Sequence, residues 1–141
     1  MKQVDPLSPL HFVLTMEYFT RLMKQLSTRA EFKFHQYYKG LKLNHLMFAD
    51  DVVIFCKAHP PTLQLIKQTL KKFHVATGLE ASATKSHIIF RGCCTALKSA
   101  CLQETGFQEG TLPMTYLGIP IIASRLSKME CIHWWKRLWG K

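Results

Sequence analysis

Residues 45–56 read HLMFADDVVIFC, two short apolar runs separated by an alanine and two aspartates. The runs are rich in β-branched, aromatic and long apolar side chains, which favour strands, and aspartate is a good turn residue. Ahead of the turn the side chains alternate, with His45 and Met47 on the face opposite Phe48. The stretch predicts a β-hairpin whose apolar arms are covered on at least one face.

A long amphipathic helix is expected before this hairpin, over about residues 7–27. Asp5 suits its N-cap and Pro6 its first helical position. Apolar side chains recur along one helix face, at Phe12, Met16, Phe19, Met23 and Leu26. A second apolar set widens that stripe, at Leu10, Val13, Leu14, Tyr18 and Leu22. We therefore expect a helix that is buried on much of its surface, with an exposed apolar patch wherever a small domain cannot cover it.

Shorter elements are expected after the hairpin. Pro60 and Pro61 begin a second amphipathic helix that runs to about Ala76, and Gly78 suits its C-cap. The apolar stripe of that helix consists of Leu63, Ile66, Leu70 and Phe73. The remaining segments are a strand at 87–90, a helix at 95–105, an extended stretch at 116–122 and a helix at 127–139. Together these elements predict an α+β fold with an antiparallel sheet.

Length and composition agree with one packed domain. The chain has 141 residues, of which 48% are apolar and 20% charged, so we expect a single domain over residues 1–141. The longest apolar run, residues 52–56, is too short to span a membrane, and the first residues lack the pattern of a signal peptide. The five cysteines include no CxxC pair, which favours reduced thiols. These features predict an intracellular protein without a membrane partner.

The charge balance indicates an anionic partner and makes the two hairpin aspartates conspicuous. Nineteen Lys and Arg against nine Asp and Glu give a formal net charge of +10, for which nucleic acid is the commonest partner. Asp50 and Asp51 are adjacent, and the chain has only one other aspartate. Two carboxylates on a rigid turn suit a hard cation such as Mg²⁺ or Mn²⁺, whereas a solvated acidic turn needs no function. Both interpretations remain open on these residues alone.

Four sequence blocks resemble one enzyme family. Residues 46–55 resemble the (F/Y)ADD hairpin of reverse transcriptases, and are most similar to the non-LTR (LINE-type) retrotransposon polymerases common in plant genomes. Residues 3–9 resemble the QGDPLSP block that opens the long palm helix, with Val4 in place of its glycine. Residues 78–86 resemble the GL…KS block, and residues 116–120 resemble the YLG block at the palm–thumb junction.

The resemblance implies a partial polymerase palm over about 1–111, and a palm–thumb junction with the start of the thumb over about 112–141. It implies nucleotidyl transfer to a primer 3′-OH with two Mg²⁺ (or Mn²⁺) ions. The implied partners are an RNA template, a DNA primer and deoxynucleoside triphosphates. The implied site residues are Asp50 and Asp51 for catalysis and metal binding, Gln3, Asp5, Pro6, Ser8 and Lys85 for the template and nucleotide, and Leu117 and Gly118 for the primer.

The same resemblance implies parts that this sequence lacks. The family takes a further essential aspartate, and its fingers, from segments that precede the QGDPLSP block. Since that block lies beside Met1 here, we expect an N-terminally truncated element with an incomplete metal site and no polymerase activity alone. Beyond Ser127 the similarity fades.

Two other interpretations stay open beside the polymerase. One is a non-catalytic, basic nucleic-acid-binding module that uses phosphate contacts and aromatic stacking. The other is a retroelement relic without function, whose exposed core aggregates or recruits a partner chain. If the role of the family is retained, the expected compartment is the nucleus.

Overall fold

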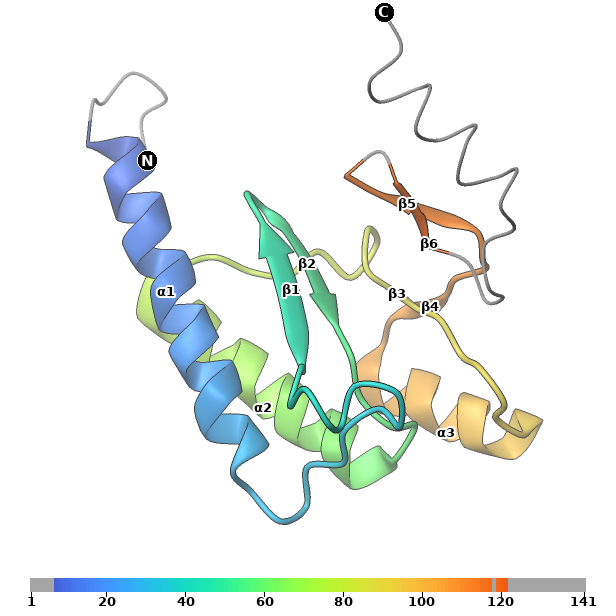
Figure 1. Cartoon of the computed structure of the whole chain (residues 1–141). Helices are drawn as coiled ribbons and strands as arrows, with labels where there is room; N and C mark the ends of the chain where they lie inside the picture. The colour runs from blue at the N-terminus through green and yellow to red at the C-terminus, as the bar shows by residue number, and fades with distance from the viewer. Residues whose placement is uncertain (1–6, 118, 122–141) are drawn as a thin grey trace, which may run out of the picture.

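The computed structural model describes residues 7–117 and 119–121, which form an α+β fold (Figure 1). Its elements, in chain order, are α1 (Ser8–Ser27), β1 (His45–Phe48), β2 (Asp51–Ile54), α2 (Pro60–Thr77), β3 (His87–Ile88), α3 (Thr95–Thr105), β4 (Gln108–Glu109), β5 (Met114–Tyr116) and β6 (Ile119–Ile121). The predicted class is confirmed, and both long helices and the helix at 95–105 lie where the sequence predicts them. The helix predicted at 127–139 lies outside the described residues.

Helix α1 begins later than its predicted cap. Leu7 occupies the N-cap without a side-chain capping bond, so the expectation of Asp5 as N-cap is wrong. Pro9 is the second helical residue, a position that tolerates proline because the first turn of a helix has no partner for its N–H groups. The helix ends at Ser27, where the backbone N–H of Thr28 donates to the Gln25 carbonyl and that of Arg29 donates to the Leu26 carbonyl.

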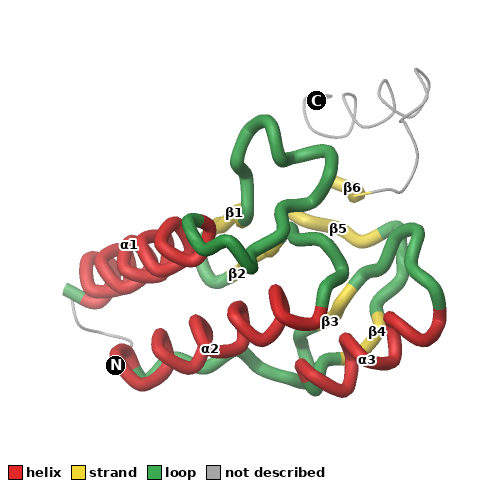
Figure 2. Tube along the Cα trace, turned by 90° about the horizontal axis from the view of Figure 1, so that it is seen from below, coloured by secondary structure: helices red, strands yellow, loops and turns green. Residues whose placement is uncertain are grey.

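The core lies where the C-terminal half of α1 meets α2. Phe19 of α1 and Phe73 of α2 pack edge to face with ring centroids 5.2 Å apart. Helix α3 packs against the other side of α2 and contributes the fully buried Cys101 (Figure 2). The buried apolar residues are Met16, Phe19, Met23, Leu26, Phe32, Leu63, Ile66, Phe73 and Cys101.

The end of α2 has the predicted glycine cap. Gly78 has a φ of 73°, in the left-handed region, and its N–H donates to the carbonyl of His74 at 2.7 Å. Only glycine adopts this conformation without strain from a Cβ atom. Ile66 and Phe73 of the predicted apolar stripe face the core, whereas Lys71 and Lys72 are exposed.

The strands form three separate two-stranded ladders within the described residues, rather than one antiparallel sheet. β1–β2 and β5–β6 are antiparallel, but β3 pairs with β4 in parallel. The single extended stretch expected at 116–122 is wrong, because Leu117 turns the chain at a φ of 54° between β5 and β6. The backbone at Gly110, directly after β4, lies very close to β3, since a Cβ atom added to Gly110 would lie 2.9 Å from Cβ of His87.

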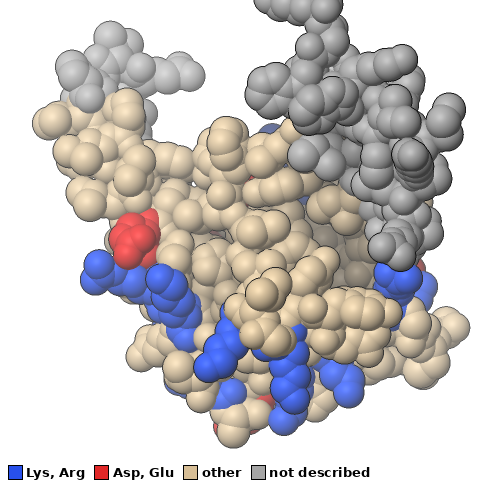
Figure 3. Space-filling view, viewed as in Figure 1, with Lys and Arg blue, Asp and Glu red and all other residues tan. Residues whose placement is uncertain are grey.

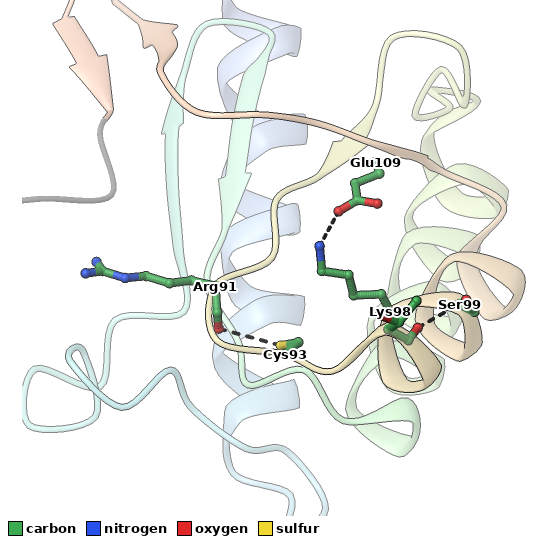
Figure 4. A network of polar contacts seen from close by, with 6 residues as sticks. Arg91, Cys93, Lys98, Ser99 and Glu109 are labelled. Carbon is green, nitrogen blue, oxygen red and sulfur yellow. Dashed lines mark hydrogen bonds and ion pairs between the residues drawn. The ribbon is translucent and has the colours of Figure 1, made fainter.

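An ion pair ties α3 to the strand that follows it. The Lys98 ammonium lies 2.6 Å from the Glu109 carboxylate, as Figure 4 shows, and also 5.7 Å from the centroid of the Phe90 ring. Both charged side chains are partly exposed, so the pair contributes about 1 kcal/mol or less. Across the described part of the chain, no helix has the length and hydropathy needed to cross a membrane.

Candidate functional site

The two adjacent aspartates lie at the tip of the β1–β2 hairpin. Phe48 pairs with Asp51 in the strand register, so Ala49 and Asp50 form the two-residue connection between the strands. Ala49 has a φ of 49°, a left-handed conformation that costs a non-glycine residue about 1–2 kcal/mol. Asp50 in this short connection and Asp51 at the start of β2 are therefore held by a backbone with little freedom.

The hairpin has a packed face and an exposed face. Met47 and Ile54 pack against the helical core. Leu46 and Phe48 on the other face are 42% and 61% exposed, and Asp51 lies directly opposite Phe48. Because residues paired across a ladder share one face of the sheet, Asp51 lies on the exposed face.

The root of the hairpin is held by a buried asparagine. Asn44 is 5% exposed, and its Nδ2 donates to the carbonyl of Met23 on α1 at 2.7 Å. Its Oδ1 accepts from Nδ1 of His45 at 2.7 Å, and its backbone carbonyl accepts from the N–H of Phe55 at 2.8 Å. Asn44 therefore joins both arms of the hairpin to α1.

His45 forms the second contact of the hairpin with α1. Since Oδ1 of Asn44 accepts only, Nδ1 of His45 carries the proton and Nε2 accepts from the Thr20 hydroxyl at 3.5 Å. Burial lowers the pKa of His45, and the positive charge of Lys24 lowers it further. The imidazole therefore acts as a neutral structural bridge, 5.9 Å from the Phe19 ring centroid.

Asp50 and Asp51 are both exposed. Within residues 7–117 and 119–121, neither carboxylate accepts a hydrogen bond or forms an ion pair. The described residues also include no group of three or more His, Cys, Asp or Glu side chains that could hold a metal ion. Two carboxylates can bind a hard cation whose other ligands are water or phosphate oxygens, as Mg²⁺ prefers.

The other predicted site residues lie on separate segments. Ser8 is the first residue of α1 and is partly buried, whereas Lys85 is exposed in the turn that precedes β3, where its N–H donates to the Ser82 carbonyl at 3.2 Å. Leu117 is 45% exposed at the turn between β5 and β6.

The start of α1, the β1–β2 tip and the β5–β6 hairpin lie toward the same end of the molecule in Figure 1. Among the described residues, no hydrogen bond or ion pair joins Ser8, Lys85 or Leu117 to the two aspartates. Gln3, Asp5, Pro6 and Gly118 lie outside the described residues.

Sequence reasoning missed the buried polar residues that hold the site in place. Besides Asn44, the fully buried Thr62 donates to the carbonyl of Glu31 at 3.1 Å and accepts from the N–H of Lys33 at 3.2 Å. These bonds attach the segment that links α1 to β1 to the first turn of α2. The only sequence signal for Asn44 is an amide at the start of an apolar strand, and Thr62 has none beyond following two prolines.

One of three comparisons with known proteins identifies a family. A family model described as "Reverse transcriptase (RNA-dependent DNA polymerase)" matches residues 1–121, a range that includes the acidic hairpin and ends with β6. No curated protein matches the chain. No solved structure matches it.

Proposed function

The chain belongs to the reverse transcriptase family, and from that premise we propose that its acidic hairpin holds metal in an RNA-directed DNA polymerase site of the non-LTR (LINE-type) class. The observation that carries the proposal is the pair Asp50 and Asp51, exposed at the tip of the hairpin and without a protein partner among the described residues. The substrates are an RNA template, a DNA primer and deoxynucleoside triphosphates. The proposed compartment is the nucleus, if the role of the family is retained.

Each site residue has a separate proposed task. Asp50, in the turn, is the principal ligand of Mg²⁺ or Mn²⁺, and Asp51 is its neighbour on the exposed face. Bound metal supplies Lewis-acid stabilisation of the charge that develops when the primer 3′-oxygen displaces pyrophosphate. The exposed Lys85 ammonium binds the triphosphate by charge, and Leu117 with Gly118 positions the primer end.

The template and incoming nucleotide are assigned to the segment around the start of α1. Gln3, Asp5, Pro6 and Ser8 belong to this part of the proposal, and Ser8 is at the first turn of the helix. Two-metal chemistry needs more carboxylate ligands than Asp50 and Asp51 provide. We expect the additional aspartate to come from another segment of the polymerase or from a second chain.

Metal binding tests the hairpin directly. Water-proton relaxation of Mn²⁺ measures the affinity of the whole chain and of the Asp50→Asn, Asp51→Asn and Glu80→Gln variants. We expect weak binding that both Asn variants reduce, because the amide is neutral, and that the Glu80 variant retains. Equal affinity in the wild-type chain and the Asp50→Asn variant would remove the proposed metal site.

Primer extension tests the catalytic assignment. We expect no extension by this chain alone, and measurable extension when it is joined to a fingers-and-palm segment that carries its own aspartate, with Val4 changed to Gly. In that fusion Asp50→Asn should abolish extension, and Asp51→Asn should reduce it less. Extension by the Asp50→Asn fusion at the parent rate would show that Asp50 is not the catalytic ligand.

A further inference from the structure

The solvent face of α2 carries positive charge only. Helix α2 contains three lysines and no acidic residue. Lys67 donates to the backbone carbonyl of Glu104 at 2.7 Å, whereas Lys71 and Lys72 have no carboxylate partner among the described residues. Lys67 and Lys71 are four residues apart, and such like-charge pairs destabilise a helix by about 0.2–0.5 kcal/mol. This arrangement lowers the intrinsic stability of α2 and leaves its charge available to an external anion.

A groove beside this face is lined by further hydrogen-bond donors. It runs between the C-terminal part of α1 and the middle of α2, with Gln25 and Arg29 on one side and Gln68 and Lys72 on the other. Its remaining lining residues are apolar except for the Thr69 hydroxyl, and none is acidic. Two cations and two amides therefore face one groove without a carboxylate to neutralise them. In the view of Figure 1, which looks onto the β1–β2 hairpin with α2 behind it, most Lys and Arg side chains seen in Figure 3 lie over the lower half of the molecule.

The chemistry of these donors favours a nucleic-acid strand. Guanidinium and ammonium groups bind phosphate, and glutamine amides both donate and accept hydrogen bonds with sugars and base edges without requiring one sequence. Gln68 and Lys72 lie about one helical turn apart on α2, about 6 Å along the axis for four residues at about 1.5 Å each, so the two side chains can contact neighbouring units of an extended strand. The hairpin tip lies toward the upper end of the molecule in Figure 1, whereas the C-terminal part of α1, which lines the groove, lies toward the lower end.

We propose that the groove between α1 and α2, with Arg29 and Lys72 on its two sides, binds the phosphate backbone of a single RNA strand outside the acidic hairpin. This contact needs no metal and no catalysis, and it is independent of the site proposed above.

The test compares two variants that remove equal charge from different places. One is the double variant Arg29→Gln and Lys72→Gln, and its matched control is Lys39→Gln and Lys42→Gln, two exposed cations on the loop before β1. Fluorescence anisotropy with a labelled, unstructured oligouridylate, in EDTA and over a series of salt concentrations, gives the affinity and its salt slope. Circular dichroism establishes that each variant remains folded.

We expect the groove variant to lose affinity and to have a log–log salt slope shallower by about 0.7 for each of the two lost phosphate contacts. The control variant should keep a slope near that of the parent chain. Equal changes in both variants, or no change in the groove variant, would overturn the proposal. Because EDTA removes metal, failure of the hairpin site cannot produce either outcome.

Competitors identify the class of partner. Polyglutamate and vesicles containing phosphatidylserine are added at charge concentrations equal to that of the RNA. We expect the RNA to bind more tightly than either competitor, and only its binding to depend on Arg29 and Lys72. Tighter, groove-dependent binding of polyglutamate would assign the groove to an acidic protein, and the same result with vesicles would assign it to a membrane surface; either would overturn the RNA proposal.

Discussion

The two halves of α1 are similarly apolar in sequence but lie in opposite surroundings. In the C-terminal half, Leu26 is 4% exposed and Met23 is fully buried. In the first two turns, Leu10 and Leu14 are 56% and 59% exposed. The hairpin shows the same contrast, with Asn44 buried at its root and the acidic residues exposed at its tip. Stability thus comes from the helical base, whereas the end that carries the proposed chemistry is left accessible.

A matched pair of leucines in α1 gives the largest expected contrast. Leu26→Ala leaves a cavity in the core and should lower the free energy of unfolding by about 2–5 kcal/mol. Leu14→Ala removes an exposed side chain and should change it by about 0.5 kcal/mol or less. Urea unfolding of both variants measures the difference. Equal costs would mean that the first turns of α1 are covered in solution, by another part of the protein or by a second chain.

The hairpin turn gives a smaller effect at the accessible end. Ala49 has a φ of 49°, where a β-branched side chain is strained more than alanine. Ala49→Val should lower the free energy of unfolding by about 1–2 kcal/mol. Ala49→Gly should leave it almost unchanged, because relief of strain offsets the added freedom of the unfolded chain. If the urea midpoints of the two variants coincide, the residue is not left-handed in solution.

The smallest expected effect is that of His45 on the pH dependence of the free energy of unfolding. Its pKa lies below 6.5 in the folded protein, because burial and the charge of Lys24 disfavour protonation. The unfolded chain binds this proton more readily, so the contribution to stability is complete above pH 6.5 and decreases as the pH falls below that value. When the pH is lowered from about 7.5 to about 5.5, the free energy of unfolding should decrease less in His45→Gln than in the exposed control His11→Gln. An identical pH dependence in the two variants would contradict the buried, neutral imidazole.

The sequence predicted the helices and the acidic hairpin well because each depends on neighbouring residues. The periodic apolar positions of α1, the prolines and glycine that bound α2, and the aspartates at the turn all act within a few residues of chain. Long-range pairing was harder to predict. The parallel contact of β3 with β4 depends on Gly110 meeting His87 across the intervening helix, and two-residue strands leave too little pattern to show it.

The sequence by itself determined the α+β class, the family through its ordered blocks, and the position of Asp50 and Asp51 at a hairpin turn. Only the tertiary structure decided which apolar half of α1 is buried, since helical periodicity identifies a face but not its partner. It also decided that Asn44 and Thr62 anchor the hairpin and the first turn of α2, because a buried polar group requires partners that are distant along the chain. The groove with Arg29 and Lys72 likewise exists only after α1 and α2 pack, when residues 43 positions apart come to line one surface.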